Sequence, residues 1–202
     1  MKKKISIFTG WLAASLLAAM VALMPVAAPA EEVQAPGSTS VMRTPLLLPN
    51  AGFENGLEKW ATSPAADTKA YEFALDTAVF HSGKQSVRIR SVGGDAGGAV
   101  YQVIPIAALR GKTLELGGWL KTSNAAGDGA ALTLRVFDAD GRLLEYNLMY
   151  QAPVKGTADW KRYAIPVKVS KNAMDLEIGV LLNNKGTVWA DDLELNVISH
   201  ER

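Results

Sequence analysis

Oxygen-bearing side chains gather in two short stretches that lie far apart in the chain. Asn50–Trp60 carries Glu54 within a Gly-containing turn, and Gly186–Leu193 carries the adjacent carboxylates Asp191 and Asp192. Ca²⁺ takes about six to eight oxygen ligands from carboxylates and backbone carbonyls. The two stretches therefore supply the chemistry of a calcium site that would tie the two ends of a domain together. The alternative is a solvated loop glutamate and a turn-capping aspartate.

Residues suited to catalysis are sparse. The chain has no Cys, and its two histidines, His81 and His200, lie in a predicted turn and a predicted frayed tail. No nucleophile-elbow, zinc-protease or phosphate-loop motif occurs. Two carboxylates at glycosidase spacing carry no weight, because 20 acidic residues make some such pair inevitable. The sequence favours a non-catalytic protein.

The overall composition is that of an ordinary globular protein. The 202 residues are 49% hydrophobic and 20% charged, with a formal net charge of +1. There is neither a basic excess nor a long run of like charge, so the composition argues against a nucleic-acid partner.

The N-terminus has the three parts of a secretory signal peptide. Lys2–Lys4 form a positive region, Trp11–Met24 an apolar one, and Ala28–Ala30 a small-residue cleavage site. We therefore expect residues 1–30 to be removed after Ala30. The protein would then be exported, periplasmic or secreted, with no stable membrane anchor. An uncleaved anchor is the alternative, because Ile5–Met24 is just long enough to span a bilayer.

Beyond the signal peptide, a polar lead-in precedes a domain of short strands. Residues 31–45 are aperiodic and contain Pro, Gly and Ser, which predicts a flexible linker and a folded domain over 46–202. Apolar and polar residues then alternate with period two, and Gly, Asn and Asp clusters interrupt the alternation. The alternating segments are 86–90, 114–121, 132–137, 163–169, 176–181 and 192–197.

This pattern predicts an all-β sandwich or jelly roll. Asp140-Gly141 is the clearest hairpin turn. Ile106–Arg110 is expected to form one short helical turn.

Six segments, in order, resemble the carbohydrate-binding modules of cellulose- and xylan-degrading enzymes, which have a galactose-binding-like fold. They are Asn50–Trp60, His81–Ile89, Val100–Val103, Leu114–Lys121, Gly156–Tyr163 and Gly186–Leu193. The resemblance implies a jelly-roll β-sandwich of two antiparallel sheets, a structural Ca²⁺ at one edge, and often a sugar-binding cleft on the concave sheet.

For the metal, the resemblance points to Glu54 and Asp192 as side-chain ligands. It adds backbone carbonyls near Gly52 and in the turn that ends at Lys84. Strand parity would point Asp191 inward, so a β-bulge at the aspartate pair would decide which of the two reaches the ion.

For the sugar, we look for outward-facing aromatic and hydrogen-bonding side chains. Trp119 is the leading candidate, because its strand neighbours have the inward parity. Arg135 has the outward parity on another predicted strand. Tyr146 and Tyr150 share one parity, and Gln102 is a possible hydroxyl partner. The alternatives are that Trp119 covers an edge or packs under a loop, that the tyrosines form a core edge, and that Gln102 is merely solvated.

The remaining tryptophans of the domain, Trp60, Trp160 and Trp189, are expected to anchor loops and strand ends. The segment 176–183 has no aromatic residue, although some sugar-binding relatives carry Tyr or Glu on the equivalent strand. The leading hypothesis is an exported, calcium-stabilised module that binds a polysaccharide or cell-wall glycan on an aromatic-bearing concave sheet. The alternative is a structural or protein-interaction domain of the cell envelope, with an envelope protein as partner and no sugar affinity.

Overall fold

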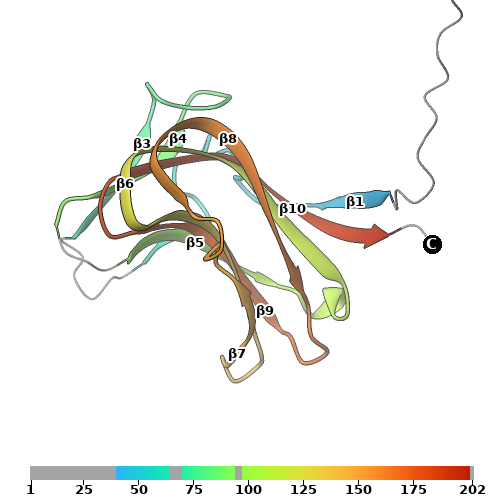
Figure 1. The fold of residues 1–202 in the computed structure, drawn as a ribbon. Coiled ribbons are helices and arrows are strands. Elements are labelled where there is room, and N and C mark those ends of the chain that lie inside the picture. The colour runs from blue at the N-terminus through green and yellow to red at the C-terminus, as the bar shows by residue number, and fades with distance from the viewer. Residues whose placement is uncertain (1–39, 64–69, 94–96, 201–202) are drawn as a thin grey trace, which may run out of the picture. The chain divides into compact units, whose positions relative to one another are not determined.

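The computed structural model describes residues 40–63, 70–93 and 97–200, whose regular elements are β-strands apart from one short 3₁₀ turn (Figure 1). The predicted signal peptide and most of the predicted linker lie outside these residues. Among the described residues, no helix has the length and apolar character needed to cross a membrane. The elements are β1 (Val41–Leu46), β2 (Ala61–Thr62), β3 (Tyr71–Asp76), β4 (Ser86–Ser91), β5 (Gly97–Pro105), the 3₁₀ turn η1 (Ala107–Leu109), β6 (Thr113–Phe137), β7 (Leu143–Asn147), β8 (Val154–Lys168), β9 (Asp175–Asn183) and β10 (Thr187–His200).

The described strands form two antiparallel layers that share β6. Their hydrogen-bonded order is β2-β5-β9-β6-β10-β4-β3, with β1 on β10 and both β7 and β8 on β6. The first half of β6 pairs with β10 and β8, and its second half pairs with β9 and β7 (Figure 1). The first layer thus contains β3, β4, β10 and β8, and the second contains β2, β5, β9 and β7. The predicted jelly-roll β-sandwich is confirmed.

β6 bends between the layers without ending. Residues 124–129, which the sequence predicts as a turn between two strands, lie inside it, and its register with β8 shifts repeatedly between Leu120 and Ala130. Asn124, Gly127 and Gly129 have left-handed backbone conformations, which glycine and asparagine adopt at low cost. These residues let the strand turn from one layer into the other while its ladder continues on both sides.

The core lies between the two layers. Leu114, Leu116 and Leu120 from the first half of β6 are fully buried, as are Leu132 and Leu134 from its second half. Burying one such side chain stabilises the fold by about 1.5–3 kcal/mol. The inward parity predicted for these residues is confirmed. The predicted hairpin at Asp140-Gly141 joins β6 to β7, and η1 lies within the predicted helical turn.

The folded region begins earlier than predicted. β1 pairs with β10 from His200 to Leu195, and all of it except Leu46 falls in the predicted flexible linker. Arg43 Nε and Nη2 donate to both carboxylate oxygens of Glu115, at 2.7 and 3.1 Å. Because β1 is held by this ladder and ion pair with little burial, its sequence lacks the alternation that marks the other strands.

Candidate functional site

The outer face of the second layer is hollowed over β5, β9 and β6. The hollow, which we call the cleft, has a volume of about 400 Å³. Its lining residues are Ser63, Gly97, Ala99, Tyr101, Arg135, Tyr150, Glu177, Leu181 and Asn183. Two of the sugar-site residues expected from sequence, Arg135 and Tyr150, therefore lie in one cavity.

An ion pair forms part of the cleft lining. Arg135 on β6 and Glu177 on β9 are cross-strand partners, and Arg135 Nη1 donates to Glu177 Oε1 at 2.8 Å. The two side chains are 35% and 17% exposed. Their charges cancel locally, while the remaining guanidinium N–H groups and carboxylate lone pairs can still bond a ligand.

Tyr101 is an aromatic lining residue that the sequence reasoning missed. It lies opposite Gly179 in the β5–β9 ladder, and a Cβ on Gly179 would clash with the Val100 carbonyl oxygen and crowd Tyr101 Cβ at 3.0 Å. Because Gly179 has no side chain, β5 and Tyr101 can pack directly against it. Parity was the available signal, since Tyr101 alternates with the buried Val100 and Gln102.

Gln102 has a different role from the one expected. It is only 5% exposed, and its Nε2 donates to the Pro49 carbonyl oxygen at 2.8 Å. Its amide is therefore part of the protein interior, where it fixes the loop before β2. We remove Gln102 from the sugar site.

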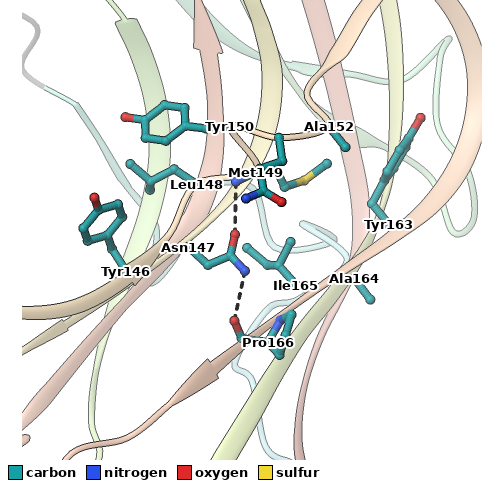
Figure 2. Close-up of a pocket in the computed structure, with 11 residues that line it drawn as sticks. Tyr146, Asn147, Leu148, Met149, Tyr150, Ala152, Tyr163, Ala164, Ile165 and Pro166 are labelled. Carbon is teal, nitrogen blue, oxygen red and sulfur yellow. Dashed lines mark hydrogen bonds between the residues drawn. The ribbon is translucent and has the colours of Figure 1, made fainter.

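Tyr146 and Tyr150 line a second hollow beside the cleft. Tyr146 is the cross-strand partner of Arg135, and both tyrosines are exposed, at 57% and 63%. The second hollow, of about 550 Å³, lies between residues 146–152 and residues 163–166 of β8 (Figure 2). Tyr150 lines both hollows.

Trp119 lies away from the cleft, in the first layer. The ring of His81 stacks on it with centroids 3.9 Å apart and planes 16° apart, and Trp160 meets His81 edge-on at 5.9 Å. Trp119 does have the outward parity expected. However, β6 contributes to both layers. Trp119 and Arg135 both face outward, but they lie on the outer faces of different layers. We therefore remove Trp119 from the sugar site.

The two aspartates of β10 occupy a β-bulge, where the register shifts between Asp191 and Glu194. Asp191 is fully buried, and its Oδ2 accepts the backbone N–H groups of His81 and Ser82 at 2.9 and 3.1 Å. Burial raises the pKa of the Asp191 carboxyl, against the effect of these hydrogen bonds. Asp191 thus holds the 81–82 turn. Asp192, with a left-handed φ of 47°, also contacts this turn, because its Oδ1 accepts the Ser82 hydroxyl at 2.8 Å.

The four residues expected at a metal site lie close together. Glu54 Oε1 accepts the backbone N–H of Lys84 at 2.9 Å, and a Cβ on Gly52 would lie 3.6 Å from Asp192 Oδ1 and 3.9 Å from Glu54 Cγ. Asp192 Oδ2 also lies 2.6 Å from His81 Nδ1. Within the described ranges, no group of three or more His, Cys, Asp or Glu side chains has a metal-holding arrangement. Any cation here would need backbone carbonyls as further ligands.

Two of the other tryptophans have the structural roles expected. Trp60 is buried against Phe53, with ring centroids 4.9 Å apart, and its Nε1 donates to the Asn50 carbonyl oxygen. Trp189 Nε1 donates to Asp76 Oδ2 at 2.8 Å. Trp60 thus joins the start of β2 to the loop before it, and Trp189 joins β10 to the end of β3.

Comparison with known proteins gives one curated relative and several structural neighbours. The chain is 30% identical over 143 residues to the uncharacterized HTH-type transcriptional regulator YbfP of Bacillus subtilis (strain 168), over 68% of this chain and 47% of that protein. It thus spans about half the length of that relative.

Two solved structures share the fold. The enzymatically active domain of bacteriophage CBA120 tailspike protein 4 has a TM-score of 0.59 and 18% identity, over 74% of this chain and 21% of that one. The C-terminal family 22 carbohydrate-binding module of Clostridium thermocellum Xyn10B has a TM-score of 0.52 and 16% identity, over 73% and 90%. At such identities these likenesses concern the fold alone.

The sequence itself carries the assignment. Residues 47–186, more than half of the chain, match the family described as "Carbohydrate binding domain". This span includes β2 to β9 and every residue that lines the cleft. The chain therefore belongs to the carbohydrate-binding domain family.

Proposed function

We propose that this protein is a non-catalytic module that binds a polysaccharide or cell-wall glycan in the cleft over β5, β9 and β6. The observation that carries the proposal is the Arg135–Glu177 ion pair in a hollow that Tyr101 and Tyr150 also line. Aromatic rings and a few polar groups converging in one hollow are the usual composition of a small-molecule site.

Each kind of side chain has a role in this proposal. The rings of Tyr101 and Tyr150 would contact the apolar C–H faces of sugar units. Arg135, Glu177 and Asn183 would exchange hydrogen bonds with sugar hydroxyls. Because Arg135 and Glu177 already hold each other on neighbouring strands, binding would immobilise little additional side-chain freedom, which favours affinity.

The structural neighbours support this proposal in different degrees. The Clostridium thermocellum module has a cleft whose amino acids take part in ligand binding, and this chain spans 90% of that module. The tailspike domain is enzymatically active, yet this chain spans only 21% of that structure. Together with the sparse catalytic residues of the sequence, this supports binding without catalysis.

The proposal includes a structural calcium ion held by Glu54 and Asp192, with backbone carbonyls near Gly52 and Lys84. The donors are hard oxygens, as calcium prefers. No ion pair in the described residues joins Glu54 or Asp192 to Lys or Arg, so the carboxylates lack a strong cationic partner. A bound ion would compete with His81 for Asp192 and would tie β10 to the loop before β2.

The proposal also includes export, with cleavage after Ala30. The protein would then work in the periplasm or the medium, where polysaccharides and cell-wall glycans are found. An envelope protein remains the partner under the alternative hypothesis, and a direct assay of glycan binding separates the two.

Affinity electrophoresis tests the sugar site. The purified protein would run through gels that contain soluble β-glucan, xylan, mannan or peptidoglycan fragments, beside Tyr101→Ala and Trp119→Ala. We expect at least one polymer to retard the parent and Trp119→Ala, and Tyr101→Ala to migrate freely. Free migration of the parent in every gel would refute glycan binding and favour the envelope alternative. Equal retardation of Tyr101→Ala would move the site away from the cleft.

A further inference from the structure

We propose that the second hollow continues the cleft, so that the protein binds a neutral, linear polysaccharide along its length and not at a chain end. We call this hollow the Tyr163 groove; it lies between residues 146–152 and residues 163–166 of β8. The inference rests on the proposed function, because it extends the same ligand beyond the cleft.

Two tyrosines connect the cleft with the groove. Tyr150 is 63% exposed and lines both hollows. Tyr146 lines the groove and is also the cross-strand partner of Arg135, which lines the cleft. A polymer lying in the cleft therefore has an exposed aromatic surface leading from Arg135 to the groove.

The lining of the groove has the chemistry of a neutral sugar site. Tyr146, Tyr150 and Tyr163 supply aromatic rings, and Asn147 and Gln151 supply amides that both donate and accept. None of the described side chains that line it is charged. The lining side chains thus offer rings and hydrogen-bonding partners and no charge of their own, which suits a neutral glycan.

The segment that carries Tyr150 is held in place without ligand. Asn147 Nδ2 donates to the Pro166 carbonyl oxygen at 3.0 Å, and Asn147 Oδ1 accepts the backbone N–H of Met149 at 3.2 Å (Figure 2). Met149 has a left-handed φ of 52°, and its sulfur accepts the backbone N–H of Leu132 at 3.2 Å. Both ends of the turn are thus fixed, one to β8 and one to β6, and Tyr150 follows directly. Such a preformed site limits the ordering that binding requires.

Tyr163 forms the far side of the groove. In Figure 2 the Tyr163 ring lies on one side of the labelled residues, and Tyr146 and Tyr150 lie on the opposite side. The ring is half-buried, which raises the pKa of its hydroxyl, and Lys161 Nζ lies 5.6 Å from its centroid. A ligand that extends from the cleft to Tyr163 would pass Tyr150, which lines both hollows. Sugar units would then lie on both sides of Tyr150, and recognition would need no free chain end.

Titration calorimetry with oligosaccharides of increasing length tests this inference. The oligosaccharides come from the neutral polymer that retards the parent most strongly. For the parent, we expect affinity to rise about two- to tenfold once the oligosaccharide is long enough to reach the groove, which is the range for one added aromatic contact. Tyr163→Ala should bind short oligosaccharides like the parent and lose the gain for long ones. Tyr150→Ala should weaken both.

Gln151→Ala is the second groove variant, because this exposed residue has no role in the core. It keeps the test decisive if Tyr163→Ala unfolds. A length-dependent gain that survives in Gln151→Ala and in a folded Tyr163→Ala would overturn the groove while leaving the cleft intact. Tight binding of short oligosaccharides with no gain for long ones would do the same. If the parent binds no polymer at all, the proposed function itself fails.

Discussion

Arg135 on β6 and Glu177 on β9 are cross-strand partners, and their 2.8 Å ion pair lies in the same hollow as Tyr101 and Tyr150. The first layer carries a comparable partly exposed pair, Arg162–Glu194, outside the cleft. Both are Arg–Glu pairs, but only Arg135–Glu177 lines the cleft. A comparison of variants in the two pairs therefore separates an effect on binding from an effect on stability.

Arg135→Ala should weaken glycan binding by about tenfold or more, because a hydrogen bond from a charged group contributes about 1.5–3 kcal/mol. The free energy of unfolding should fall by less than about 1 kcal/mol, since the pair is partly exposed. Calorimetric titration and urea unfolding measure the two effects. Arg162→Ala is the matched control and should keep full affinity; a similar loss of affinity in both variants would contradict a specific role for Arg135.

Gly179→Ala should destabilise the protein by about 1–3 kcal/mol, because the new methyl group would press on the Val100 carbonyl oxygen and on Tyr101. It should also weaken glycan binding by displacing the tyrosine. Urea unfolding and affinity electrophoresis report these changes. Gly93→Ala, at a site with no atom within 4 Å, is the control and should behave like the parent.

Calcium should raise the melting temperature of the parent. An ion that binds only the folded state stabilises it by about 2.7 kcal/mol when its concentration is a hundredfold above Kd. Glu54→Gln and Asp192→Asn should each remove most of this response. Glu58→Gln changes an exposed carboxylate in the same loop and should retain it. Identical melting curves in calcium and in chelator would count against the ion.

Glu115 should make stability depend on pH in the acid range. The hydrogen bond from Arg43 lowers the pKa of the Glu115 carboxyl in the folded state, against a smaller effect of burial. Its contribution is therefore complete above the ordinary glutamate pKa, about 4.3, and is lost as the pH falls through the lower folded-state value.

Glu115→Gln should accordingly be less stable than the parent by about 1 kcal/mol at neutral pH. The difference should shrink as the pH is lowered below about 4. Urea unfolding of both proteins across this range measures it. A difference that stays constant with pH would mean that Glu115 acts through packing and not through its charge.

Much of the architecture could be predicted from local patterns. Alternation identified the buried faces of β6 and β9, since a strand with one wet face must alternate. A bulge does lie at the aspartate pair, where strand parity alone left the side-chain directions open, and both carboxylates contact the 81–82 turn. Glu54 and Asp192, far apart in the sequence, both lie beside Gly52.

The cleft was harder to predict, because it depends on which layer each segment joins. Trp119 and Arg135 are both outward-facing residues of β6, yet the bend at residues 124–129 sends them to different layers. Parity is a local property, whereas membership of a layer is set by long-range pairing. Tyr101 was missed for another reason: the motif around it drew attention to Gln102, whose amide is buried.

The pairing of β1 with β10 places Val41 opposite His200, so the described domain starts and finishes at neighbouring points (Figure 1). A pulling force applied through these two points would act across the ladder and not along it. The backbone hydrogen bonds between the two strands would then break one after another, at low force. The cleft lies over β5, β9 and β6, whereas β1 pairs with β10, so peeling of β1 would leave the proposed binding site intact.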